Sequence, residues 1–188
     1  MKAASLKEIQ QELAGRTNQE LIALCLRLAR FKKENKELLT YLLFEAFDQE
    51  AWVGLIKQDM GDQFEEMNTS NLYLVKKSLR KILRTIGKFS RYAGSATVDV
   101  QLRLHFFSLS RAHDIPINAS AALENLYQGQ EKKIRSLIAG MHEDLQFDYL
   151  KELELLVQVP GKTSAAKKII SYFQKKKHAK IKEKKTPS

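Results

Sequence analysis

The segment from Asn71 to Tyr92 constrains the fold most, because its residue pattern fits only one kind of secondary structure. At 100° per residue, its apolar side chains fall within an arc of roughly 120° and its cations fall within the opposite arc. The apolar set is Leu72, Val75, Leu79, Ile82, Leu83, Ile86 and Phe89, and the cationic set is Lys76, Lys77, Arg80, Lys81, Arg84, Lys88 and Arg91. The segment is predicted to be an amphipathic helix with a cationic outer face.

Helical patterns of this kind recur along the chain, and only three prolines interrupt its 188 residues. We therefore expect an all-α fold of seven or eight helices in antiparallel hairpins, with the superhelical character of helix-pair repeats left open. Gly129 is expected to separate a helix at 119–128 from one at 130–139.

Two N-terminal segments are apolar around most of the helix circumference and are predicted to form the centre of the core. The first, Leu21 to Phe31, follows the capping box Thr17-Asn18-Gln19-Glu20, in which the Thr17 and Glu20 side chains each bond the other's backbone amide. The second runs from Leu38 to Phe47.

The segment from Thr97 to Phe106 alternates apolar and polar residues, which is also the period of a half-buried strand. We predict a helix, because a lone strand would leave its backbone groups unpaired and no other segment offers a convincing partner. The sequence leaves the strand interpretation open.

Positive charge is concentrated at the C-terminus. The segment from Lys162 to Ser188 has ten lysines and one acid, Glu183, and so carries +9 of the total +10. We expect one helical domain over residues 1–174 and a mobile tail over 175–188. The tail lysines are Lys175, Lys176, Lys177, Lys180, Lys182, Lys184 and Lys185.

An acidic segment precedes the basic helix. Residues 45–66 have a net charge of −6, whereas residues 67–98 have seven cations and no acid. If the two segments pack as antiparallel neighbours, Asp59, Asp62, Glu65 and Glu66 could neutralise the basic face through ion pairs. Whether that face is neutralised or free decides if it can bind a ligand.

The charge pattern favours binding over catalysis. We expect a non-catalytic intracellular protein that engages a polyanion, foremost nucleic acid without base specificity, through the basic tail and the basic helix. Tyr73 and Tyr92 lie in or beside the cationic arc and are candidates for stacking on bases. The alternative is a helical adaptor for an acidic or helical protein partner, and an enzyme of unknown reaction comes third.

The sequence offers no motif for catalysis, a metal or a cofactor. It has no glycine-rich phosphate loop, and His105, His113, His142 and His178 lie too far apart for a local zinc motif. The densest acidic groups, at 59–66 and 142–148, are typical of solvated helix faces or first helical turns. We therefore expect no catalytic or metal-binding residue and no cofactor.

The single cysteine, Cys25, favours a reducing cytoplasm. The apolar stretches, such as Leu38 to Phe44, are shorter than the roughly 18 to 20 residues of a membrane span. No membrane-spanning helix is expected.

The stretch Leu24-Cys25-Leu26-Arg27-Leu28-Ala29-Arg30-Phe31-Lys32-Lys33-Glu34-Asn35-Lys36-Glu37-Leu38-Leu39, continued by Tyr41-Leu42-Leu43-Phe44, resembles the N-terminal part of an uncharacterised bacterial all-helical family. Lys81-Ile82-Leu83-Arg84-Thr85-Ile86 fits the same pattern. The family has no assigned activity, so the resemblance implies a helical fold and nothing about ligands.

Overall fold

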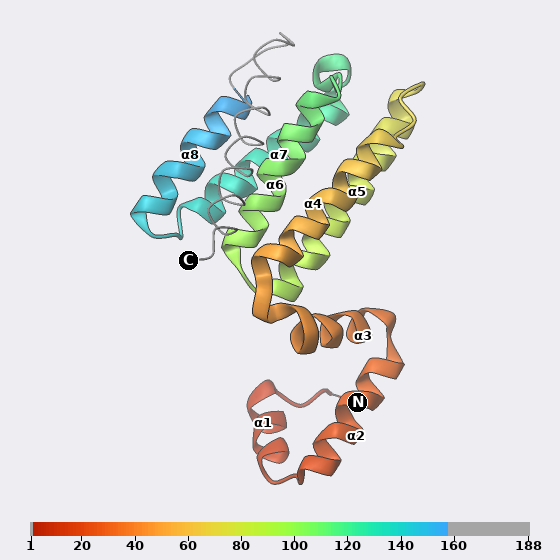
Figure 1. Cartoon of the computed structure of the whole chain (residues 1–188), viewed down its shortest axis with the longest axis vertical. Coiled ribbons are helices and arrows are strands. Elements are labelled where there is room, and N and C mark those ends of the chain that lie inside the picture. The colour runs from red at the N-terminus through yellow and green to blue at the C-terminus, as the bar shows by residue number, and fades with distance from the viewer. Residues whose placement is uncertain (1, 158–188) are drawn as a thin grey trace, which may run out of the picture. The chain divides into compact units, whose positions relative to one another are not determined.

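The computed structural model describes residues 2–157, and every regular element in this range is helical. The α-helices are α1 (Leu6–Ala14), α2 (Asn18–Phe31), α3 (Lys33–Thr40), α4 (Gln49–Glu65), α5 (Leu72–Ala93), α6 (Ala96–Ala112), α7 (Ala121–Ile138) and α8 (Glu143–Val157), shown in Figure 1. A π-helical turn spans Tyr41–Glu45, and short 3-10 turns span Ala46–Asp48 and Ile117–Ala119. The predicted all-α class is confirmed.

The chain divides into two compact units, which we call unit 1 (Met1–Gln49) and unit 2 (Glu50–Ser188). The single domain expected over 1–174 stays a prediction, because its last part lies outside the described residues. The Lys-rich tail over 175–188 lies outside them as well. Among residues 2–157, no helix is both long and apolar enough to cross a bilayer.

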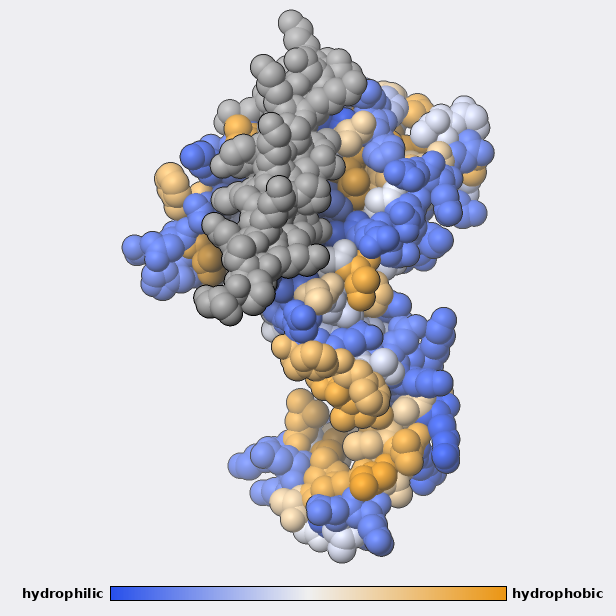
Figure 2. All heavy atoms as spheres, viewed as in Figure 1, coloured by the Kyte–Doolittle hydropathy of each residue, from blue (hydrophilic) through white to orange (hydrophobic). Residues whose placement is uncertain are grey.

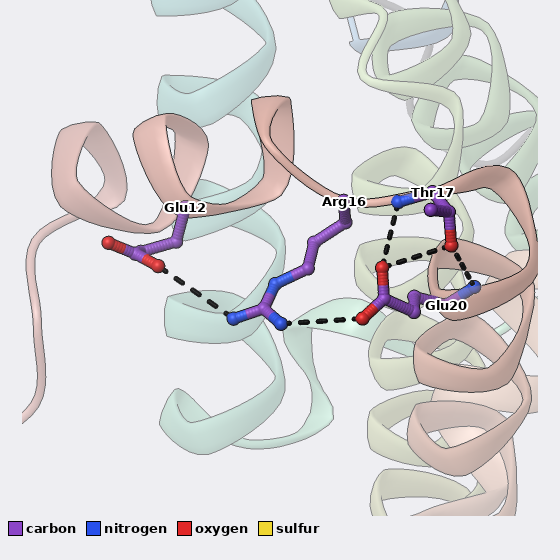
Figure 3. A network of polar contacts seen from close by, with 4 residues as sticks. All are labelled: Glu12, Arg16, Thr17 and Glu20. Atoms are coloured by element: carbon purple, nitrogen blue, oxygen red, sulfur yellow. Dashed lines mark hydrogen bonds and ion pairs between the residues drawn. The ribbon is translucent and has the colours of Figure 1, made fainter.

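Unit 1 begins with two capped helices. The predicted capping box is present at α2: the Glu20 carboxylate accepts from the Thr17 amide at 2.8 Å, and Thr17 Oγ1 accepts from the Glu20 amide at 3.3 Å. The Thr17 hydroxyl also donates to the Glu20 carboxylate, at 3.0 Å. The bonds from the Thr17 amide and hydroxyl lower the pKa of Glu20, and the bond from the amide contributes most. Arg16 lies between Glu12 and Glu20, at 3.8 and 3.5 Å (Figure 3).

The prediction that residues 21–31 and 38–47 form the centre of the core is wrong. Leu26 is 47% exposed and Phe44 is 67% exposed. Within residues 2–49, Tyr41 is the only buried side chain. The chain turns to an extended conformation at Lys32 and changes helix type at Tyr41, so unit 1 consists of short helices with too few neighbours to cover one another.

Unit 2 is organised around α6, which is buried on several sides at once. The Phe106 ring lies 5.7 Å from the Phe64 ring of α4 and 5.5 Å from the Tyr127 ring of α7. From the same helix, Gln101 donates a hydrogen bond to the Tyr149 hydroxyl of α8 at 3.1 Å. The helix predicted over 97–106 is confirmed, and the alternation that imitates a strand reflects burial around a central helix.

The neighbouring helices each contribute one apolar face. That of α5 consists of Val75, Leu79, Ile82 and Ile86, and that of α7 consists of Leu123, Tyr127, Ile134 and Ile138. α7 runs without a break through Gly129, so the predicted division there is wrong. A glycine inside a helix costs about 1 kcal/mol, which burial of the four α7 side chains outweighs.

Two leucine substitutions test which surfaces form the core of unit 2. Leu79→Ala should lower the free energy of unfolding by about 2 to 5 kcal/mol, because it leaves a cavity at a fully buried site. Leu55→Ala removes the same atoms from an exposed site on α4 and should change stability by less than about 0.5 kcal/mol. Denaturant unfolding measures both, and equal losses would contradict this arrangement.

Candidate functional site

The cationic face of α5 is not neutralised by the acidic helix before it. In the described part of the chain, the acids Asp59, Asp62, Glu65 and Glu66 form no ion pair with Lys76, Lys77, Arg80, Lys81, Arg84 or Arg91. The reason is geometric. α4 and α5 both turn apolar faces inward, with the Trp52 and Phe89 rings 5.6 Å apart, so their charged faces diverge. The ion-paired hairpin considered from the sequence is therefore not formed.

Part of the cationic face borders a groove of about 640 Å³ within unit 2. One wall of the groove comes from α5 and the opposite wall comes from α7. A single side chain of α6, Arg103, also lines the groove. The lining residues are Tyr73, Lys76, Lys77, Arg80, Leu83, Arg84, Gly87, Arg103, Leu126, Gln130 and Lys133. We call this feature the basic groove. It is lined by six cations, and none of its lining residues in the described part of the chain is an acid.

Local structure positions the two walls. α5 begins where the Asn71 side chain accepts a hydrogen bond from the Tyr73 amide at 2.7 Å, and it ends at Gly94, whose φ of 59° is left-handed. α7 begins where Ser120 Oγ accepts from the Leu123 amide at 3.3 Å. Both helices bury their apolar faces. The side chains at the edge of each apolar face, next to the solvent-exposed side of the helix, therefore border the groove.

Arg103 is the buried cation of the basic groove and is only 3% exposed. Its Nε lies 2.8 Å from Asp99 Oδ1, a close ion pair that lacks good hydrogen-bond alignment. Its Nη1 donates a hydrogen bond to Gln130 Oε1. Arg103 is thus fixed between α6 and α7.

Asp99 joins three helices. Its Oδ1 accepts from the Ser90 hydroxyl of α5 at 2.8 Å, and its Oδ2 lies 3.5 Å from Lys133 Nζ of α7. The carboxylate therefore compensates part of the charge of Arg103 and Lys133. The net charge of the three groups remains positive.

The chemistry of the basic groove suits an anion with several charged groups. Arg80 and Arg84 lie four residues apart, about 6 Å along the helix axis, and both line the groove. Guanidinium groups match the geometry of phosphate oxygens and can bind them in pairs. Tyr73, 65% exposed, adds an accessible ring beside these charges.

The sequence-predicted binding residues fall into three groups. Lys76, Lys77, Arg80, Arg84 and Tyr73 line the basic groove, whereas Lys81, Lys88 and Arg91 do not. Tyr92 is partly buried and its ring lies 6.0 Å from that of Phe89, with Lys88 Nζ above both rings. The tail lysines lie outside the described residues.

Sequence reasoning missed Arg103, Gln130 and Lys133. One signal was present: Asp99 and Arg103 stand four residues apart in a segment with many apolar residues, a spacing that suits an ion pair on one helix face. The contribution of α7 had no comparable signal, because it depends on how α6 and α7 pack.

The other chemical candidates are dispersed. His105 Nε2 lies 3.2 Å from the Lys57 carbonyl, and His142 lies 3.5 Å from Asp144 in an exposed turn. Gln63 donates to Asp59 at 2.6 Å. Within residues 2–157, no group of three or more His, Cys, Asp or Glu side chains could hold a metal ion.

In comparisons with known proteins, no family model matches the chain, no curated protein matches it, and no solved structure matches its fold. The resemblance noted over residues 24–44 gains no support from these comparisons. The function is therefore argued from the basic groove itself.

Substitutions in two ion pairs of equal length test whether the contacts of Asp99 beneath the groove stabilise the fold. Asp99→Asn leaves the Arg103 guanidinium buried without its counter-charge and should lower the free energy of unfolding by about 3 kcal/mol or more. Glu131→Gln breaks the Arg135–Glu131 pair, which has the same 2.8 Å distance and four-residue spacing, but whose arginine is 45% exposed. It should cost less than about 1 kcal/mol. Similar losses in denaturant unfolding would contradict a structural role for Asp99.

Proposed function

We propose that this chain is a binding protein for nucleic acid that does not read base sequence, and that the basic groove is its principal site. The observation that supports this most directly is the groove itself, with six cations and an accessible tyrosine. A phosphate chain could place successive charges along Lys76, Arg80 and Arg84, which follow one another by single turns of α5. The tail lysines from Lys175 to Lys185 would extend the contact.

Two features of the groove favour single-stranded nucleic acid as the ligand, bound without sequence specificity. Single-stranded sites combine a cationic groove with rings on which bases stack, and Tyr73 supplies such a ring. Reading base edges needs side chains with free donors and acceptors. The one amide group that lines the groove, Gln130, already uses its oxygen to accept from Arg103, so it cannot form the two-bond pair by which an amide reads adenine.

The cytoplasm is the compartment we propose, because a lone cysteine such as Cys25 stays reduced there. The alternative function, a helical adaptor for a protein partner, is favoured by a different observation, the exposed apolar side chains of unit 1. An enzyme of unknown reaction remains the third candidate.

The groove proposal is tested with paired charge substitutions on α5. Arg80→Gln with Arg84→Gln removes two cations from the groove, and Lys81→Gln with Arg91→Gln removes two exposed cations from the same helix outside it. If both arginines contact phosphates, the groove variant should weaken single-strand binding by about tenfold and flatten the slope of log affinity against log salt by about 1.4. The control pair should change the slope by less than half as much.

The measurement is fluorescence anisotropy with labelled single-stranded oligonucleotides of unrelated sequence, titrated at several salt concentrations. A third variant, truncated after Gln174, measures how much the tail contributes to the affinity and to its salt dependence. If the two double variants change affinity and salt slope equally, the groove is not the principal binding site. A free nucleotide binding as tightly as the oligonucleotide would point to a small phosphate ligand instead.

Tyr73 gives a test that does not depend on charge. Tyr73→Ala should lower single-strand affinity by about 1 to 3 kcal/mol, the usual contribution of one stacked base. Tyr73→Phe keeps the ring and should bind as the unmodified chain does. Because Tyr73 is largely exposed, neither change should alter thermal stability appreciably. If Tyr73→Ala binds normally, the ring is not a stacking platform.

A further inference from the structure

The grooves of the two units differ in the charge that lines them. Figure 2 shows hydrophobic side chains gathered over unit 1. The groove between α1 and α2, about 550 Å³ in volume, is lined by three acids as well as two arginines. The basic groove of unit 2 is lined by six cations, and no acid is among its lining residues in the described chain. A phosphate group is therefore attracted to the basic groove and not to the groove of unit 1.

The basic groove ends before its two walls do. Along α5 the last lining residue is Gly87, although the helix continues to Ala93. Just beyond Gly87, Ser90 of α5 and Lys133 of α7 both contact Asp99 of α6. These contacts tie the three helices together, and we call this end of the groove the closed end.

At its other end the groove is bordered by α5 alone. α7 runs parallel to α5, with Lys133 about level with Ser90, so the first residue of α7, Ala121, is about level with Ser78. Tyr73 lies five residues before that level, and the lining residues of α6 and α7 all lie nearer to the closed end. A strand can therefore leave the groove past Tyr73, whereas at the closed end it has to stop.

The closed end contains a cation that is already fixed in place. Arg103 is 3% exposed, its Nε faces Asp99, and its Nη1 donates to Gln130. Its third nitrogen, Nη2, forms no hydrogen bond within residues 2–157 and, unlike Nε, is not fully buried. This nitrogen can donate to an anion in the groove without rearrangement of the side chain, which lowers the entropy cost of binding.

Gly87 leaves room for a ligand close to Arg103, because it lies about level with Gln130, the partner of Arg103. At 100° per residue, position 87 is within about 25° of the centre of the arc of the other α5 lining residues, so a side chain there would point into the groove. A Cβ built on Gly87 would meet no atom within 4 Å. Its backbone is helical, and glycine destabilises a helix, so neither conformation nor packing requires glycine here. An open path to Arg103 does.

The charge at the closed end fits a terminal phosphate better than an internal one. Arg84, Arg103 and Lys133 line this end, and Asp99 contacts two of them, so the net charge of the four groups is +2 (3 − 1). A phosphate monoester carries about −1.5 to −2 at neutral pH, whereas an internal phosphodiester carries about −1. A terminal phosphate also suits a closed end, because the strand continues from it on one side only.

We propose that the basic groove takes the phosphorylated end of a nucleic-acid strand. The terminal phosphate lies at the closed end and accepts from Arg103 Nη2, and the following nucleotides run toward Tyr73. Gly87 and Tyr73 stand 14 residues apart on α5, about 21 Å along the helix axis, which is long enough for several nucleotides. This assignment rests on the proposed function of the groove in binding nucleic acid.

The test compares strands of one sequence that carry a 5′-phosphate, a 3′-phosphate or no terminal phosphate. Each is labelled at an internal base, and its affinity for the full chain is measured by fluorescence anisotropy. At least one phosphorylated strand should bind about tenfold tighter than the strand with two hydroxyl ends. Gly87→Leu fills the space close to Arg103 without changing any charge and should remove that preference. Gly87→Ala adds only a Cβ and should reduce it in part.

The matched control is Gly61→Leu. Gly61 is a partly exposed helical glycine, as Gly87 is, and its Cβ would also meet no atom within 4 Å. It lies on α4, which contributes none of the lining residues, so the variant should keep the preference. Both leucine variants replace glycine with a better helix former, and neither should melt at a lower temperature than the unmodified chain.

The possible failures can be told apart. If all three strands bind equally while Arg80→Gln with Arg84→Gln weakens them, the groove binds nucleic acid but not its phosphorylated end, and the assignment is wrong. If no strand binds, the proposed function and the assignment both fail. A preference that is equally large in Gly87→Leu and Gly61→Leu would place the terminal phosphate elsewhere and also overturn the assignment.

Discussion

The burial of α6 on several sides is the constraint on which the rest of unit 2 depends. A helix in that position must present apolar side chains around most of its circumference, and every polar group that it buries must find a partner. Phe106 meets rings from α4 and α7, while Ser110 Oγ donates to the Phe106 carbonyl at 2.7 Å. Asp99 and Arg103 form an ion pair with each other and reach into α5 and α7.

This arrangement links packing to charge. Because α6 needs Ser90, Lys133 and Gln130 to satisfy its buried ion pair, the same contacts hold the two walls of the basic groove at a fixed separation. The exposed cations of α5 are then free to serve a ligand. Preorganisation of this kind lowers the entropy cost of binding.

The parts of the fold that could be predicted from the sequence were those that depend on neighbouring residues along the chain. Thr17 and Glu20 formed the expected capping box, and the residues from Leu72 to Phe89 formed the expected amphipathic helix, because both patterns depend on neighbours within one or two turns. The helix over 97–106 was also predicted correctly, by excluding a strand without a partner.

Features that depend on distant contacts could not be predicted in the same way. Apolar composition shows that Leu26 and Phe44 favour burial, but not whether other helices are near enough to cover them. Likewise, the charges of residues 45–66 and 67–98 suggested pairing, whereas packing of both apolar faces turned those charges apart. The α7 wall of the basic groove also arises only after α6 and α7 pack.

The short link between α5 and α6, Gly94 and Ser95, has a consequence for how the chain reaches its fold. With two residues between them, these helices can pair as soon as both have formed, and α7 and α8 then add in chain order. Chains dominated by such near-neighbour pairings fold quickly, because little loop entropy is lost before contacts form. The part of unit 2 from α5 to α8 is therefore suited to assembling progressively during synthesis, from the α5–α6 hairpin toward α8.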